Sequence, residues 1–198
     1  MSESGPEVLV VDDNEVIADT YAQFLADDYD VTAVYSGERA LELLGSSVEV
    51  MVLDRRMPDR SGDEVLECVR GRATDCRVVM VTAVDPSDDI VDLPFDDYVV
   101  KPVGRAELVT VVDEMRRRAS YDDPLRTFLA LASKKAALEA NTDVDALADS
   151  EAHAQVKAQL AEQREALGVE TGRLERVLDG EVPDIGETDN CDAPRTNR

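Results

Sequence analysis

Five polar side chains stand where apolar runs of the sequence end, at the points where buried strands would reach the surface. Carboxylates are hard oxygen ligands that suit Mg²⁺, and an aspartate can also act as a nucleophile. A hydroxyl and a fixed ammonium group complete a set that suits transfer of a phosphoryl group, because metal and lysine can neutralise the developing charge. The five are Asp12 and Asp13 after VLVV, Asp54 after VEVMVL, Thr82 in RVVMVTA and Lys101 at the end of DYVVK.

The elements that must position these side chains alternate between strand and helix. Short runs rich in valine predict five strands buried on both faces, and apolar residues at helical spacing predict a helix after each. The fourth helix, over 86–92, is short. This order predicts an α/β fold with a doubly wound, five-stranded parallel sheet of the flavodoxin-like kind. Acids that end adjacent strands then meet, so Asp12, Asp13 and Asp54 repel one another unless a cation joins them.

Composition bounds the class of protein. The chain has 198 residues, with 44 acids against 21 bases and a net charge of −23. An excess spread along the whole chain fits a protein adapted to a very salty cytoplasm, and it repels phosphate backbones. Three cysteines form no paired framework and no metal cluster, no P-loop is present, and no apolar stretch is long enough to span a membrane. These features predict a cytoplasmic protein without a membrane partner.

The stretches VLVVDDN, VMVLDRRMPDRSG, VMVTA and DYVVKP together resemble the signature of a response-regulator receiver domain of two-component signalling. The resemblance implies that Asp54 is the phosphoacceptor and that a sensor histidine kinase or phosphotransfer protein supplies the phosphoryl group. It implies that Mg²⁺ is the cofactor. Asp13 would bind the metal directly, Asp12 would help through water, Asp54 would share it, and Arg56 would contribute its backbone carbonyl.

The same resemblance assigns roles around the phosphoacceptor. Thr82 would be the switch hydroxyl, Lys101 the phosphoryl-binding lysine and Tyr98 the aromatic that moves inward. Tyr98 taken alone is more typical of a packing residue, but its place three residues before Lys101 favours the switch role. Lys101-Pro102 resembles the cis peptide of the family. Two arginines beside the acids are unusual, since a guanidinium there could pair with Asp12 in the free state or with the phosphoryl group later.

After Ser120 the strand pattern stops. One helix is predicted from YDDPL to Asn141 and a longer one from about Val144 to Leu178. The stretch around SKKAALE resembles the HalX domain, a helical module that follows receivers in haloarchaea. The second helix carries apolar residues mostly at heptad spacing, which predicts a helical hairpin able to close on itself or on a second chain. They are Val156, Leu160, Leu167 and Leu174.

The predicted domains are a receiver (1–119), a HalX-like hairpin (120–180) and a disordered acidic tail (181–198). We expect a phosphoprotein that signals through phosphorylation-dependent protein contacts, with a possible homodimer through the C-terminal helices. The alternative is a transcription regulator that binds DNA through the helical domain. That needs a basic recognition helix, whereas residues 120–180 carry 7 bases and 12 acids. An enzyme is not expected, beyond assistance to its own Mg²⁺-dependent phosphorylation and dephosphorylation.

Overall fold

The computed structural model describes residues 7–72, 74–121, 123–142, 146–147 and 150–167. The predicted tail at 181–198 and the predicted end of the second C-terminal helix lie outside these residues. Within the described stretches, the structure contains no helix with the length and apolar character that crossing a bilayer requires.

Five strands form one sheet in the order β2-β1-β3-β4-β5, and every pair of neighbours is parallel. The prediction of a doubly wound α/β sheet is therefore confirmed. Alternate residues of the central strands face opposite sides of the sheet, and each side carries its own apolar cluster. The strands are β1 (Glu7–Val11), β2 (Asp30–Val34), β3 (Val48–Leu53), β4 (Arg77–Thr82) and β5 (Asp97–Val100).

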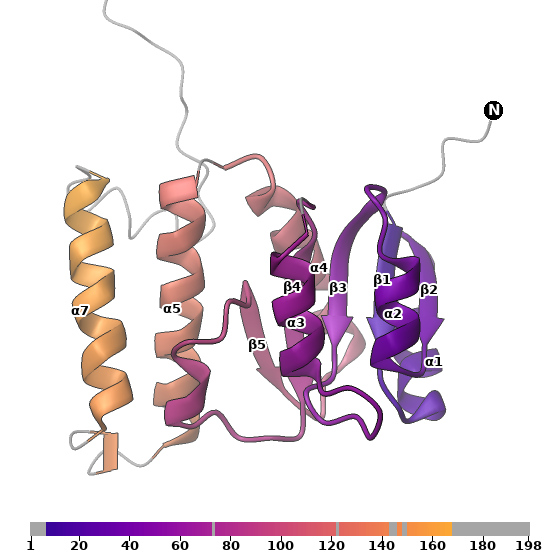
Figure 1. Cartoon of the computed structure of the whole chain (residues 1–198), viewed down its shortest axis with the longest axis horizontal. Coiled ribbons are helices and arrows are strands. Elements are labelled where there is room, and N and C mark those ends of the chain that lie inside the picture. The colour runs from indigo at the N-terminus through magenta and orange to yellow at the C-terminus, as the bar shows by residue number, and fades with distance from the viewer. Residues whose placement is uncertain (1–6, 73, 122, 143–145, 148–149, 168–198) are drawn as a thin grey trace, which may run out of the picture.

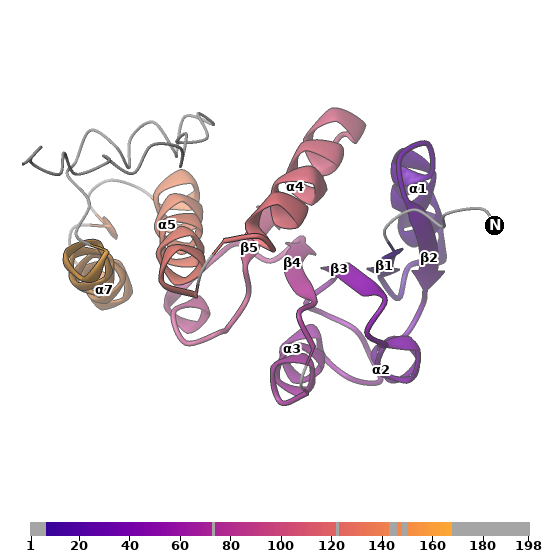
Figure 2. The ribbon, with the colours of Figure 1, turned by 90° about the horizontal axis from the view of Figure 1, so that it is seen from above.

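Four helices cover the two faces of the sheet, with α1 and α4 on one side and α2 and α3 on the other (Figure 2). Two further helices, α5 and α7, lie side by side beyond β5 (Figure 1). The helices are α1 (Glu15–Leu25), α2 (Gly37–Leu43), α3 (Gly62–Arg70), α4 (Arg105–Arg118), α5 (Asp123–Asn141) and α7 (Glu151–Ala166).

Two predicted helices differ from the structure. The segment 86–92 forms a single 3₁₀ turn, η1 (Asp88–Ile90), because a run this short, bounded by proline and rich in Asp and Ser, cannot repay the cost of helix nucleation. The helix α7 begins at Glu151, whereas Val144, near which the second C-terminal helix was expected to begin, lies outside the described residues. Ser150 sets this start, since its side chain accepts a hydrogen bond from the backbone N–H of His153.

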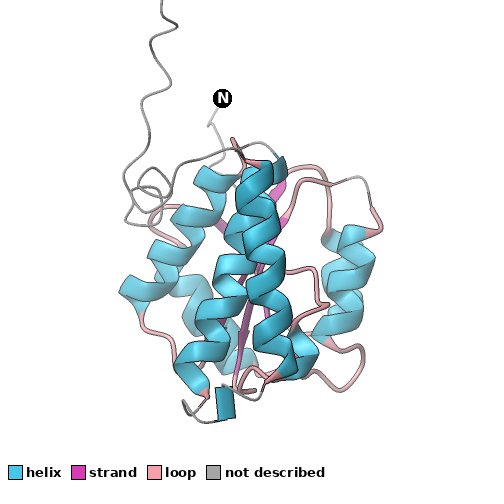
Figure 3. Ribbon diagram, turned by 90° about the vertical axis from the view of Figure 1, so that its left-hand side faces the viewer, coloured by secondary structure: helices cyan, strands magenta, loops and turns pink. Residues whose placement is uncertain are grey.

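The helical hairpin of α5 and α7 packs against the receiver at the edge strand β5. Figure 3 looks onto this side and shows the two helices in front of the strands. Leu138 of α5 and Val156 of α7 join the same apolar cluster as Ile90 and Phe95 of the segment between β4 and β5. The hairpin thus covers a sheet edge that would otherwise present unpaired backbone groups.

Two leucines of the predicted heptad stripe are already covered within this chain. Leu160 packs against the receiver-side cluster and also against Phe128 and Leu129 of α5, and Leu167 packs against the same two α5 residues. Of the two coverings that the heptad spacing allowed, by the chain itself or by a second chain, this structure shows the first for Leu160 and Leu167. Leu174 lies outside the described residues.

Candidate functional site

The three predicted acids meet at the carboxyl edge of the sheet. β1 and β3 are adjacent, with Val11 beside Leu53, and the N–H of Asp54 donates to the carbonyl of Val11 at 2.8 Å. One carboxylate oxygen each from Asp12, Asp13 and Asp54 lies within 4.8 Å of the others. Asp12 and Asp54 are buried and Asp13 is exposed, so the cluster is open to solvent on one side.

Lys101 supplies the positive charge that holds two of these acids together. Its Nζ lies 2.5 Å from Oδ2 of Asp12 and 3.4 Å from Oδ2 of Asp54. Burial raises the pKa of Asp12, while the hydrogen bond from Lys101 and the N–H of Asn14 oppose that shift. The backbone N–H of Lys101 donates to the carbonyl of Thr82 at 2.8 Å, and the Lys101-Pro102 peptide is cis as expected. The backbone hydrogen bond to Thr82 holds the lysine at the end of β5.

The donor set fits a hard divalent cation. The three acids offer only oxygen atoms, and Mg²⁺ prefers carboxylate oxygens while keeping several waters. The exposed position of Asp13 leaves room for such waters. Arg56, whose carbonyl the receiver resemblance assigns to the metal, sits in the turn that follows Asp54 and has an exposed side chain.

The turn after β3 brings the start of α3 against Asp54. Ser61 caps α3 in a capping box with Glu64, and the N–H of Gly62 donates to the carbonyl of Arg55 at 2.8 Å. A Cβ on Gly62 would lie 2.3 Å from the carbonyl oxygen of Asp54. The backbone of Asp54 can therefore come this close to the start of α3 only because residue 62 has no side chain. We did not assign Gly62 from the sequence, although a glycine directly after a helix-capping serine was the available signal.

Arg55 binds away from Asp12. Its Nε and Nη2 donate to the two carboxylate oxygens of Asp63 at 3.0 and 3.1 Å, and Nη2 also contacts Asp89. Asp12 is held by Lys101, so Arg55 does not make the pairing with Asp12 that was one of the two alternatives for a guanidinium here. The buried Arg55 joins the turn beside Asp54 to η1, a link that the sequence did not reveal because Asp89 is distant in the chain.

Thr82 and Tyr98 converge on one backbone position. Oγ1 of the fully buried Thr82 accepts from the N–H of Val84 at 3.3 Å. The hydroxyl of Tyr98 donates to the carbonyl of Val84 at 2.7 Å, and its ring lies 5.4 Å from that of Phe95. The Tyr98 side chain is buried. Both side chains therefore contact the segment on which the hairpin rests.

Comparison with known families agrees with this geometry. The family model of the response regulator receiver domain matches residues 8–113, and that of the HalX domain matches residues 117–189. The chain therefore belongs to the response regulator receiver family. Its second matched region makes it a receiver followed by a HalX domain, which agrees with both resemblances seen in the sequence.

Two individual proteins of known sequence are similar to this chain. A protein of Haloferax volcanii, named as a predicted transcriptional regulator, is 43% identical over 175 residues, which is 86% of this chain and 30% of that protein. The sensory transduction protein RegX3 of Mycobacterium tuberculosis is 36% identical over 59% of this chain and 53% of its own length. This chain thus spans about a third to a half of the curated relatives it matches.

A solved structure shares the receiver fold. The signal receiver domain of a predicted Luxo repressor protein of Vibrio parahaemolyticus is 29% identical, with a TM-score of 0.53, over 58% of this chain and 92% of that one. This likeness agrees with the receiver assignment.

Proposed function

We propose that Asp54 accepts a phosphoryl group from a sensor histidine kinase or phosphotransfer protein, and that the chain passes the signal on through protein contacts of its hairpin. One observation carries the proposal. Nζ of Lys101 reaches both Asp12 and Asp54 at the edge where Asp13 completes an acidic cluster. A nucleophilic carboxylate, a cation site and a fixed ammonium group are what phosphoryl transfer requires.

In the proposed reaction, a carboxylate oxygen of Asp54 attacks the phosphorus carried by the partner's histidine. The phosphorus–nitrogen bond breaks, and the freed imidazole recovers a proton from solvent. Lys101 neutralises the oxygens of the transferred group. Mg²⁺, when held by Asp12, Asp13, Asp54 and the Arg56 carbonyl, supplies further positive charge. The chain assists its own phosphorylation and dephosphorylation and acts on no other substrate.

The switch that we propose begins at Thr82. A phosphoryl oxygen on Asp54 draws the Thr82 hydroxyl toward it, and the N–H of Val84 then loses its acceptor. Tyr98 holds the carbonyl of the same residue, so the segment between β4 and β5 shifts as a unit. This segment carries Ile90 and Phe95, which pack on the hairpin. A local change of charge thereby loosens the contact between receiver and hairpin.

The test is mass spectrometry of the intact chain after incubation with acetyl phosphate and Mg²⁺ in high salt. We expect a gain of one phosphoryl group, none on Asp54→Asn, and none when a chelator removes the metal. Asp85→Asn is the matched control, since Asp85 is an exposed acid in the segment after β4, and this variant should gain the group. A phosphoryl group that still forms on Asp54→Asn would overturn the assignment.

DNA binding is the second candidate, because the Haloferax volcanii relative is named as a predicted transcriptional regulator. Charge opposes it, since residues 120–180 carry 7 bases and 12 acids and one of those bases, Lys134, is buried. Selection of bound sequences from a random DNA pool by the whole chain in high salt distinguishes the two. Sequence-specific capture that is lost without residues 120–180 would establish the DNA-binding role.

A further inference from the structure

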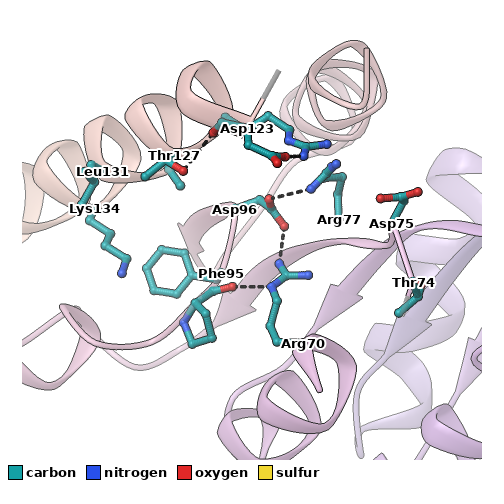
Figure 4. A pocket seen from close by; sticks show the side chains of 13 residues that line it. Arg70, Thr74, Asp75, Arg77, Phe95, Asp96, Asp123, Thr127, Leu131 and Lys134 are labelled. Carbon is teal, nitrogen blue, oxygen red and sulfur yellow. Dashed lines mark hydrogen bonds and ion pairs between the residues drawn. The ribbon is translucent and has the colours of Figure 1, made fainter. Parts of the chain in front are cut away.

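A pocket of about 460 Å³ opens between the receiver and α5, at the amino edge of the sheet and away from the acidic cluster. Its receiver wall includes Arg70, Arg77 and Phe95, which Figure 4 shows gathered opposite α5. Its α5 wall includes Arg126 and Lys134. The two-component reaction at Asp54 makes no use of this pocket.

Arg77, the first residue of β4, has two buried donors with no partner among the described residues. These are Nε and Nη2, while Nη1 lies 3.6 Å from Oδ1 of Asp96. Nε and Nη2 lie on the same edge of a guanidinium and point in parallel, which matches the two oxygens of a carboxylate or phosphate. Arg55 uses this same pair of nitrogens to bind Asp63. The corresponding edge of Arg77 can therefore bind an oxyanion, which the residues that the structure describes do not supply.

The charges around the pocket favour an anion. The pocket is lined by four cations and three acids, in a chain whose net charge is −23. Arg70 already donates to the carbonyls of Pro94 and Cys76 and to Asp96, so Asp96 is shared between two guanidinium groups. Burial lowers the pKa of Arg77, Asp96 opposes that shift, and the charge of Arg126 adds to it. One negative group in the pocket would relieve this crowding of positive charge.

We propose that this pocket binds a small organic anion, whose phosphate or carboxylate group accepts from Nε and Nη2 of Arg77 and whose less polar body lies against Phe95 and Leu131. Both nitrogens are shielded from solvent, so the anion must displace a neighbouring side chain. Asp123 lines the same pocket, its side chain is 83% exposed, and it is paired with Arg126 (Figure 4). An anion that takes the place of Asp123 at Arg126 then binds both arginines.

Because the pocket lies between the receiver and the hairpin, a bound anion should affect how the two pack together. The ligand contacts the receiver through Arg77 and the hairpin through Arg126, so it stabilises the docked arrangement by mass action. A bound anion would therefore oppose the loosening that we propose for phosphorylation. Its binding does not depend on Asp54, and the two proposals can fail separately.

The test follows the arginine Nε–H signals of the full chain by two-dimensional ¹H–¹⁵N NMR at constant KCl. The probes are adenosine monophosphate, benzoate and uncharged adenosine. We expect the Arg77 signal, identified by its loss in Arg77→Lys, to shift saturably with adenosine monophosphate if the group is a phosphate, or with benzoate if it is a carboxylate. Adenosine should leave it unchanged. No saturable shift with either anion at millimolar concentration would overturn the proposal.

Variants separate the pocket from surface charge. Arg77→Lys keeps the positive charge but removes the paired donors Nε and Nη2. Arg126→Gln removes the second cation. Each should weaken binding of the responding anion at least tenfold. Arg105→Gln is the control, because Arg105 is an exposed arginine paired with Asp27 far from the pocket, and it should bind like wild type. Equal affinity in all three variants would show that the anion binds elsewhere.

Discussion

A single ammonium group organises the candidate site at the level of residues. Lys101 contacts Asp12 and Asp54, and both acids are buried, so the charge that would otherwise oppose their approach is partly cancelled within the protein. Asp13 stays exposed and supplies the open side of the cluster. A cation can therefore be added without first breaking the pair that positions Asp54.

The sequence predicted which side chains meet here, because a residue that ends a strand of a parallel sheet can lie only at one edge. It did not predict what Arg55 and Gly62 do. The partners of Arg55 are Asp63 and Asp89, whose contacts depend on how two loops fold, and no local pattern encodes that. The constraint on Gly62 comes from the backbone of Asp54, which approaches it only in the folded turn.

Replacing Gly62 with alanine tests this close approach. A Cβ 2.3 Å from the Asp54 carbonyl oxygen must displace backbone, so we expect Gly62→Ala to lower the free energy of unfolding by about 1–3 kcal/mol. Gly45→Ala is the control, since the nearest atom would lie at 3.8 Å, an ordinary contact. Urea unfolding in high salt measures both. Equal stability of the two variants would contradict the packing that we describe.

At the level of elements, the hairpin occupies the side of the sheet where a fourth receiver helix was predicted. The segment from 83 to 96 forms only η1, and α5 and α7 pack over it. The sequence indicated that this segment was short and that two amphipathic helices followed. It could not indicate where the hairpin docks, because an apolar stripe predicts that a helix is covered but not what covers it.

Leu138 tests the docking of the hairpin. It is buried in the cluster that also contains Ile90 and Phe95, so Leu138→Ala should cost about 2–5 kcal/mol and speed amide hydrogen exchange in α5 and η1. Gln155→Ala, on the exposed face of α7, should leave exchange unchanged. Unaltered exchange in η1 of Leu138→Ala would mean that the hairpin does not rest on this segment.

Asp97, the first residue of β5, makes the contact between the receiver and the hairpin dependent on pH. It accepts hydrogen bonds from the hydroxyl of Ser133 and from the N–H of Tyr98, and burial raises its pKa above the ordinary 3.8. The folded state thus holds this proton at a higher pH than the unfolded state does. The contribution of Asp97 to stability should therefore rise as the pH falls from neutral through the folded pKa.

Asp97→Asn removes this titration and can still accept both hydrogen bonds. The free energy of unfolding of the wild type, measured relative to this variant by urea titration, should increase as the pH is lowered toward 5. A difference that stays constant with pH, or that shrinks, would contradict the raised pKa.

At the level of the whole molecule, receiver and hairpin share one apolar cluster although they match two families. A chain ending at Ser120 would expose Ile90 and Phe95, which α5 and α7 cover in the intact protein. We expect light scattering in high salt to show association of the shortened chain and a monomer for the unphosphorylated full chain. Equal monomer masses for both would argue against a shared core. A dimer of the full chain would instead support the homodimer expected from the sequence.

We propose that a phosphoryl group on Asp54 acts on the hairpin through Thr82. Amide hydrogen exchange of the full chain, before and after phosphorylation with acetyl phosphate and Mg²⁺, tests it most directly. We predict faster exchange in η1, α5 and α7 of the phosphorylated wild type, and no such change in Thr82→Ala phosphorylated to the same extent. Unchanged or slower exchange in the hairpin of the fully phosphorylated wild type would contradict the account.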